Sequence, residues 1–188
     1  GEPAADLKTT LSIAYLTQGK GDLANEQLSS ALAEKPDYAP AQLANARMKA
    51  SNKDLAGASA IVTSVLANNP KNHDALLLAG ALAAINGQAE EALSSFRKAI
   101  EAKPDFISAH VAAINQLLQQ QKLDEAGKQF EALKKLAPKH PQTLFLDTQL
   151  TYQRKDYKAA RELAQQLLKF APNSPQALQL AGAVEYQL

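Results

Sequence analysis

Three histidines have the widest chemical use in this 188-residue chain, because imidazole can act as a metal ligand or as a general base. His73, His110 and His140 lie 30 or more residues apart. A helical metal site needs a second imidazole or a carboxylate three or four residues from the first, and none of these histidines has one. The sequence therefore predicts no metal site, and we expect His110 to be a half-buried core residue.

Two pairs of acidic residues are the other candidates for chemistry, because paired carboxylates can perform acid–base catalysis. Glu90-Glu91 and Asp124-Glu125 stand where helices are expected to begin, and a negative charge there complements the positive end of the helix dipole. Capping and dipole roles are therefore expected for both pairs. The Gly19-Lys20-Gly21 turn lacks the glycine spacing of a phosphate-binding loop. We expect neither an enzyme nor a bound cofactor.

The charges nearly balance, with 20 basic and 19 acidic residues and a net charge of +1. Such a chain has no long-range field to attract nucleic acid or an anionic membrane. No apolar run approaches the roughly 18 residues of a membrane-spanning helix, so no transmembrane segment is expected in this sequence. Cysteine is absent, which excludes disulfides and thiolate metal sites.

A 34-residue repeat organises the chain. Proline recurs at this interval at positions 36, 70, 104, 138 and 172. Alanine keeps the same step in a second register, at Ala24, Ala58, Ala92, Ala126 and Ala160. A fixed period of this length is typical of solenoid proteins built from stacked units.

Each unit reads as two short amphipathic helices. In the third unit, apolar and small residues recur at helical spacing until Asn86-Gly87, which is expected to end the first helix. The second helix begins near Glu90 and is expected to stop before Pro104, since proline cannot continue a helix. Ser174-Pro175 has the form of an N-cap followed by proline at the first helical position.

These residues resemble the tetratricopeptide-repeat (TPR) pattern. The resemblance implies an all-α fold, a right-handed α-α superhelix of five helical hairpins plus one extra helix. It covers residues 1–188 as a single array, a fragment of a longer one, with units at 5–38, 39–72, 73–106, 107–140 and 141–174 and the first helix of a sixth at 175–188. It also implies a protein-binding scaffold.

In the TPR family, the first helices of the units line a concave groove. Carried over to this sequence, the resemblance implies a nearly uncharged groove that binds a protein or peptide ligand. The expected groove residues are Leu43, Arg47, Leu77, Ala81, Val111, Asn115, Leu118, Phe145, Gln149, Tyr152 and Gln153. The alternative is that several of them pack between neighbouring helices and face no ligand.

Two further functions are alternatives. A cytoplasmic TPR adaptor or co-chaperone would share the fold, but the basic clamp of TPR co-chaperones is poorly matched here, where only Asn115 agrees. Carbohydrate binding is suggested by Tyr152, Tyr186 and the many glutamines.

A narrower resemblance covers residues 144–188. The sequence of Gln153–Lys169, followed by Pro172 and by Leu178–Leu188, resembles that of the TPR lipoproteins of the PEP-CTERM/exosortase system of Gram-negative bacteria. It implies a periplasmic or outer-membrane-anchored scaffold in exopolysaccharide export or protein sorting; a cytoplasmic location is the alternative. The helix at 175–188 carries an apolar stripe, and self-association through it is expected.

Overall fold

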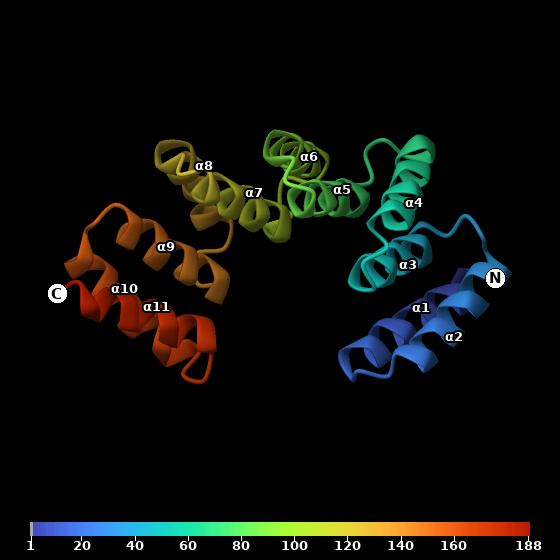
Figure 1. The fold of residues 1–188 in the computed structure, drawn as a ribbon, viewed down its shortest axis with the longest axis horizontal. Helices are drawn as coiled ribbons and strands as arrows, with labels where there is room; N and C mark the ends of the chain where they lie inside the picture. The colour runs from blue at the N-terminus through green and yellow to red at the C-terminus, as the bar shows by residue number, and fades with distance from the viewer. Residues whose placement is uncertain (1) are drawn as a thin grey trace. The chain divides into compact units, whose positions relative to one another are not determined.

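The computed structural model describes residues 2–188, and that stretch folds into eleven α-helices with no β-strand (Figure 1). The helices group into two compact units, Gly1–Gln88 and Ala89–Leu188. The first unit contains α1 (Glu2–Thr17), α2 (Gly21–Glu34), α3 (Ala39–Ser51), α4 (Leu55–Asn68) and α5 (His73–Ile85). The second contains α6 (Ala89–Ala102), α7 (Ile107–Gln119), α8 (Leu123–Leu136), α9 (Pro141–Gln153), α10 (Tyr157–Phe170) and α11 (Pro175–Tyr186). The expected all-α fold, ten alternating helices and one more, is confirmed.

Within each unit, the helices pack in the order of the repeat. In the first unit, α1 pairs with α2 and α3 with α4, while α3 also contacts α1, and α5 contacts α3 and α4. In the second, α7 pairs with α8 and α9 with α10, and α11 lies against α9 and α10. Odd-numbered helices are therefore the first helix of a repeat, called helix A below, and even-numbered helices are helix B. The third repeat supplies α5 to the first unit and α6 to the second.

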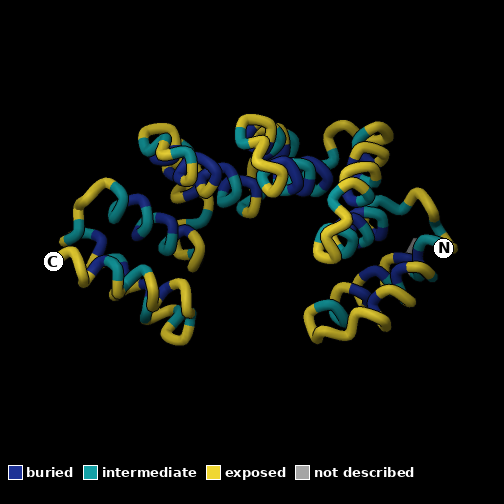
Figure 2. Tube along the Cα trace, in the orientation of Figure 1, coloured by how far each residue is buried: buried dark blue, intermediate teal, exposed yellow. Residues whose placement is uncertain are grey.

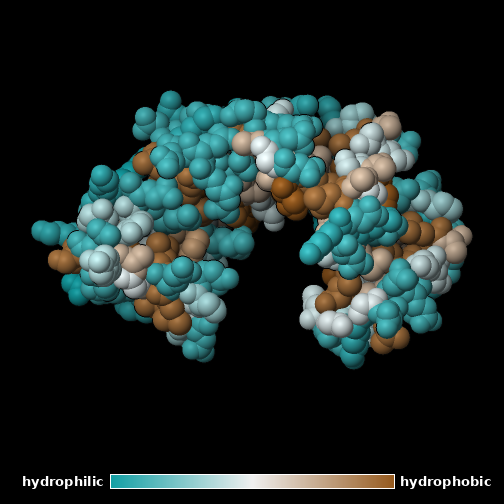
Figure 3. Space-filling view, in the orientation of Figure 1, coloured by the Kyte–Doolittle hydropathy of each residue, from teal (hydrophilic) through white to brown (hydrophobic). Residues whose placement is uncertain are grey.

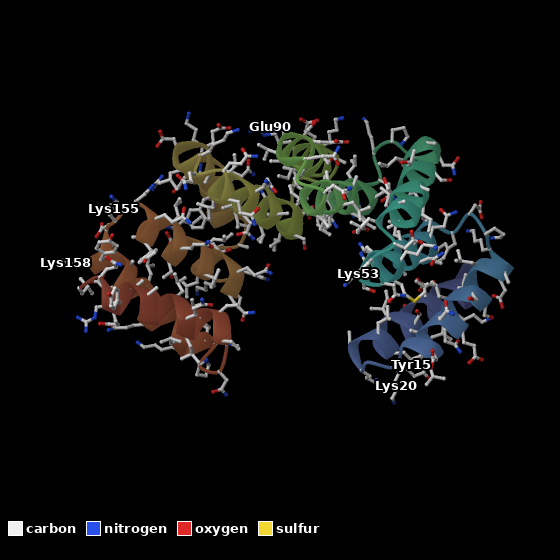
Figure 4. The ribbon with its side chains drawn as sticks, viewed as in Figure 1. Tyr15, Lys20, Lys53, Glu90, Lys155 and Lys158 are labelled. Carbon is white, nitrogen blue, oxygen red and sulfur yellow. The ribbon has the colours of Figure 1, made fainter. Side chains whose placement is uncertain are left out.

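The turn from helix A to helix B uses one backbone geometry throughout. Five residues spaced 34 apart have left-handed backbones: Gly19, Lys53, Gly87, Gln121 and Lys155, with φ between 59° and 76°. After α1, for example, the Gly19 N–H donates to the Leu16 carbonyl at 3.0 Å and the Lys20 N–H to the Tyr15 carbonyl at 2.9 Å. This pair of hydrogen bonds is the Schellman ending of a helix. Lys53 and Lys155 place a lysine where glycine is the usual residue (Figure 4).

The turn from helix B to the next helix A is built around the repeated proline. At Pro104, the preceding Lys103 N–H still donates to the Ala99 carbonyl at 3.0 Å, and the Phe106 N–H then donates to the Lys103 carbonyl at 3.0 Å. Proline ends the helix because it has no N–H to donate. At the last of these turns, Ser174 caps α11 by accepting from the Ala177 N–H, with Pro175 first in the helix, as the sequence predicts.

The core of each unit lies where helices A and B meet. The repeated alanines Ala24, Ala58, Ala92, Ala126 and Ala160 are all completely buried. Larger residues follow one turn later on helix B, including Leu28, Val62, Phe96 and Phe130, each at most 4% exposed. Buried segments recur along the helices of both units, alternating with exposed ones, and the turns are mostly exposed (Figure 2). A methyl group at the alanine position lets the two helices approach closely, and a close-packed interior leaves no room for more.

The paired acidic residues lie in the first turns of α6 and α8, as expected. Two of them also form ion pairs between helices B. Glu90 accepts from Lys122, the residue before α8, at 2.8 Å, and Glu125 accepts from Arg97 at 3.1 Å, so α6 is joined twice to the start of α8. The Lys122 hydrogen bond lowers the pKa of Glu90. These acids therefore have a structural role in holding successive repeats together.

Candidate functional site

The three histidines have separate structural roles. His73 lies 3.5 Å from the carboxylate of its neighbour Asp74, and His140 caps α9 by accepting from the Gln142 N–H at 3.3 Å. His110 is 5% exposed and lies between α7 and α8. Over the described residues 2–188, no three His, Cys, Asp or Glu side chains come together as metal ligands.

The His110 ring is hydrogen-bonded at both nitrogens. Its Nε2 lies 2.8 Å from the Pro104 carbonyl, which can only accept, so this nitrogen carries the proton. Its Nδ1 lies 2.8 Å from Nε2 of Gln129 and accepts from that amide. The ring thus connects the turn at Pro104 to helix α8. His110 was expected to be a half-buried core residue; it lies in the core and is more deeply buried than expected.

An apolar pocket lies in the second unit, on the side of the helices A. It has a volume of about 350 Å³, is open to solvent, and is lined by α7, α9, the end of α10 and the start of α11. Its lining residues are Val111, Asn115, Pro141, Gln142, Phe145, Leu146, Leu167, Ala171, Ser174, Gln176 and Ala177. No lining residue carries a charge, so the pocket suits an uncharged, largely apolar group.

Polar groups stand around the apolar centre of this pocket. Asn115, Gln142 and Gln176 each bring a side-chain amide, which can both donate and accept. One turn beyond Phe145 on α9, the Oε1 atom of Gln149 is buried and has no hydrogen-bond partner. Gln149 is not among the residues that line the pocket, so we assign its amide to the packing of α9.

The expected groove residues of the second unit divide into three groups. Val111, Asn115 and Phe145 come from two helices and line the pocket together. Gln149, Tyr152 and Gln153 continue along α9 and are half-buried. Leu118 is 4% exposed and belongs to the packed interior.

The expected groove residues of the first unit are more scattered. Arg47 is exposed, and Leu77 and Ala81 are half-buried on α5. Leu43 is 2% exposed and lies in a core cluster with Val62, Leu78 and Leu82. Its side chain is part of the interior of that unit.

Several pocket residues were not expected from the sequence; they lie in the first turns of α9 and α11, just before α11, and at the end of α10. Among them, Gln142 and Gln176 are 34 residues apart and are the second residues of successive 34-residue repeats. That shared register was a usable signal. Leu167 and Ala171 belong to a helix B and its following turn, and their part in the pocket depends on how α10 meets α9 and α11.

The family follows from the repeat and the paired helices together. The tetratricopeptide-repeat pattern matches residues 43–105 and 111–175. The chain belongs to the TPR family. TPR proteins are generally non-catalytic scaffolds for protein–protein interaction. Among curated proteins, none matches the sequence.

Solved TPR structures share the fold at low sequence identity. A TPR protein of Thermus thermophilus, TTC0263, superimposes with a TM-score of 0.80 at 18% identity, over 96% of this chain and 99% of that one. Yeast Tom70 gives a TM-score of 0.80 at 16% identity, over 97% of this chain and 40% of Tom70. YrrB, described as a TPR protein with an unusual peptide-binding site, gives 0.62 at 18% identity, over 92% of this chain and 89% of YrrB. These likenesses establish the α-α superhelical fold of the TPR family.

None of the helices within residues 2–188 has both the length and the apolar character needed to cross a membrane.

Proposed function

We propose that this TPR protein binds an extended segment of a partner protein, with one apolar side chain of that segment held in the pocket of the second unit. The observation that carries the proposal is the uncharged pocket between α7, α9 and α11, with Val111 and Phe145 on its walls and amides around it. Apolar pockets that hold a side chain, together with polar groups that bond the backbone, are a recurring way to recognise peptides.

The charge of the site favours one class of peptide. A lysine or arginine clamp would select a terminal carboxylate, but the pocket is lined only by apolar residues, amides and Ser174. The bound segment is therefore expected to present an aliphatic or aromatic anchor, and its backbone is expected to bond with the amides of Asn115, Gln142 and Gln176. A co-chaperone function based on a carboxylate clamp has correspondingly little support.

Carbohydrate binding has less support than peptide binding. Sugars stack on open aromatic faces, but the ring of Tyr152 is packed beside the ring of Tyr157, with centroids 5.7 Å apart and planes tilted by 57°. Tyr186 is 88% exposed but lies outside the pocket lining. Phe145 is the one aromatic side chain that lines the pocket. Peptide binding is the better account of this surface.

A selection from random displayed peptides tests the proposal. Peptides enriched on the immobilised chain are then measured by fluorescence anisotropy against Phe145→Ala and Asn115→Ala. We expect Phe145→Ala to weaken binding at least about tenfold, or about 1.4 kcal/mol. The matched control is Phe170→Ala, in the same unit, because Phe170 is 65% exposed and lies outside the pocket lining. Enriched peptides that bind the Phe145→Ala protein as tightly as the wild type would refute the site.

The cellular setting stays a prediction. A place in exopolysaccharide export or protein sorting, and a periplasmic or outer-membrane-anchored location, are supported only by the resemblance over residues 144–188. Sequencing the gene upstream tests it directly. A signal peptide followed by a cysteine would support an anchored lipoprotein. An upstream sequence that encodes no signal peptide would exclude it.

A further inference from the structure

The turn after α5 contains the one Asn-Gly pair of the sequence, Asn86-Gly87. An asparagine followed by glycine is prone to spontaneous deamidation, because glycine has no Cβ to shield its backbone nitrogen. That nitrogen can attack Cγ of the asparagine side chain and close a succinimide ring. Both residues are exposed, so water reaches the turn.

The backbone of the folded turn keeps the two reacting atoms apart. The ψ of Asn86 is 3°, so the Gly87 nitrogen eclipses the backbone nitrogen of Asn86. Ring closure requires the Gly87 nitrogen to eclipse Cβ of Asn86 instead, because Cβ carries the Cγ atom that is attacked. Cβ and the backbone nitrogen are different substituents of one tetrahedral carbon, so only a rotation about ψ brings the reacting atoms together.

The attacking nitrogen is also held by a hydrogen bond. The Gly87 N–H donates to the Ala84 carbonyl at 3.1 Å. The next N–H, that of Gln88, donates to the Ala83 carbonyl at 2.9 Å, and the two bonds together form the Schellman ending of α5. The nitrogen becomes a strong nucleophile only when it loses its proton, and a hydrogen-bonded amide proton leaves only after local opening. The turn must therefore open before Asn86 can react.

We propose that Asn86 is a spontaneous deamidation site which the folded turn keeps closed, so that the modification accumulates only in chains whose turn has opened. In the open turn, base removes the Gly87 amide proton, and the nitrogen forms a bond to Cγ of Asn86. The bond from Cγ to the side-chain amide nitrogen breaks, and ammonia leaves with a proton from water. Water then adds to either carbonyl of the succinimide ring, which yields aspartate or isoaspartate at position 86.

Either product makes the turn less stable. A carboxylate at the end of α5 lies at the negative end of the helix dipole, which is unfavourable. Isoaspartate also adds a methylene group to the backbone and so displaces the N–H groups that close the helix. Helix α5 has no charged residue after Asp74, and Figure 3 shows hydrophobic surface over this helix. The new charge therefore also changes the surface beside Ile85, which is 63% exposed.

The equivalent turn of the preceding repeat provides a control within the same chain. Asn52 has nearly the same backbone, with a φ of −85° and a ψ of 11°. The N–H of the next residue, Lys53, donates to the Ala50 carbonyl at 3.0 Å. The lysine side chain shields this nitrogen, so Asn52 should react far more slowly than Asn86 once either turn is open. Lys53→Gly should convert Asn52 into a second site of the same kind.

Peptide mapping by mass spectrometry tests the proposal on the intact chain at mildly alkaline pH. A synthetic peptide covering Ala83–Glu90 gives the rate without the fold. We expect Asn86 to react at least about tenfold more slowly in the folded chain than in the peptide, which corresponds to about 1.4 kcal/mol for opening the turn. Hydrogen exchange of the Gly87 amide should be slowed by a similar factor, because both reactions need the same N–H to be free.

Equal rates in the folded chain and in the peptide would overturn the proposal, because the turn would then give no protection. Slow deamidation with an unprotected Gly87 amide would also overturn it, because opening would not be needed. A peptide covering Lys49–Ala56 is the matched control, and its Asn52 should react far more slowly. If Asn86 reacts no faster in its own peptide, the site itself is refuted. Asn86→Gln should abolish the modification and leave the circular dichroism unchanged.

Discussion

His110 and Gln129 are joined across α7 and α8 by a hydrogen bond of 2.8 Å, in which the glutamine amide donates to Nδ1 of the ring. The opposite ring nitrogen donates to the Pro104 carbonyl at 2.8 Å. One buried side chain therefore connects a helix A, a helix B and the turn before them. The equivalent position of three other repeats is occupied by leucine, at Leu76, Leu144 and Leu178.

Replacing His110 with leucine tests how much these two hydrogen bonds contribute to the free energy of unfolding. The variant keeps apolar bulk but leaves the Gln129 amide and the Pro104 carbonyl without their partner. A cost of about 1–3 kcal/mol in the free energy of unfolding is expected, since part-buried polar groups lose their hydrogen bonds. Urea titration measures the loss, with Gln119→Leu, at an exposed place on the same helix, as the control. Equal stability of the two variants would show that the ring acts only by filling space.

The left-handed turn residues predict opposite effects for two nearby glycines. Gly19 has a φ of 71°, so Gly19→Ala should lower stability by about 1–2 kcal/mol. Gly21 begins α2 with open space around it, and Gly21→Ala should leave stability unchanged or slightly raise it. Thermal unfolding compares the two. If both substitutions lower the stability by the same amount, or neither lowers it, the turn does not need its left-handed backbone.

The same turns offer stabilising substitutions. Lys53, Gln121 and Lys155 adopt the left-handed backbone despite their side chains. Changing each to glycine should add about 0.5–1 kcal/mol, which is the left-handed penalty less the extra entropy that glycine loses on folding. A gain in stability is expected because Gly19 and Gly87 already occupy the equivalent positions of their repeats. Chemical denaturation of the triple variant measures the sum, and a loss of stability would contradict the reading.

The buried alanine of helix B should tolerate no growth. Ala126 is completely buried, so Ala126→Leu should cost about 1–3 kcal/mol through overpacking. Ala132→Leu makes the same chemical change on the exposed side of α8 and should have little effect. Denaturant midpoints of the two proteins provide the comparison. A similar midpoint for both would mean that α7 and α8 can separate at little cost.

Asp54 should make stability depend on acid pH. A hydrogen bond from Lys49, and then one from the Gly57 N–H, lower the pKa of this carboxyl group in the folded chain. The charged form therefore stabilises the fold above the ordinary pKa of aspartate, and this contribution is lost as pH falls through the lowered pKa. Asp54→Asn should be less stable than the wild type near neutral pH, with the gap closing as pH falls below the ordinary pKa of aspartate. Asp37→Asn, in an exposed turn, is the control, and a gap that does not change with pH would contradict the assignment.

Periodicity predicted most of the fold because identical local rules act five times. The prolines end every helix B, and the repeated alanines are buried in both units. Three of the left-handed turn residues could not be predicted from their residue type. Lys53, Gln121 and Lys155 carry no glycine signal, and they are revealed only by their 34-residue distance from Gly19 and Gly87.

The candidate site was predictable only in part. The repeat register indicates the side of the helix that a residue occupies, which located Val111, Asn115 and Phe145. It does not indicate how closely the next helix packs, and Leu43 is covered by neighbours such as Leu78 and Leu82. The walls contributed by Leu167 and Ala171 depend on the meeting of three helices, which a single-helix pattern does not describe.

Backbone amide NMR of the ¹⁵N-labelled chain, titrated with a peptide enriched by display, tests the central claim most directly. Binding in the uncharged pocket predicts that the largest shifts fall on α7, on the first turns of α9 and on residues 171–177, and that these shifts disappear in Phe145→Ala but remain in Phe170→Ala. Shifts confined to the helices B, or unchanged by Phe145→Ala, would contradict it.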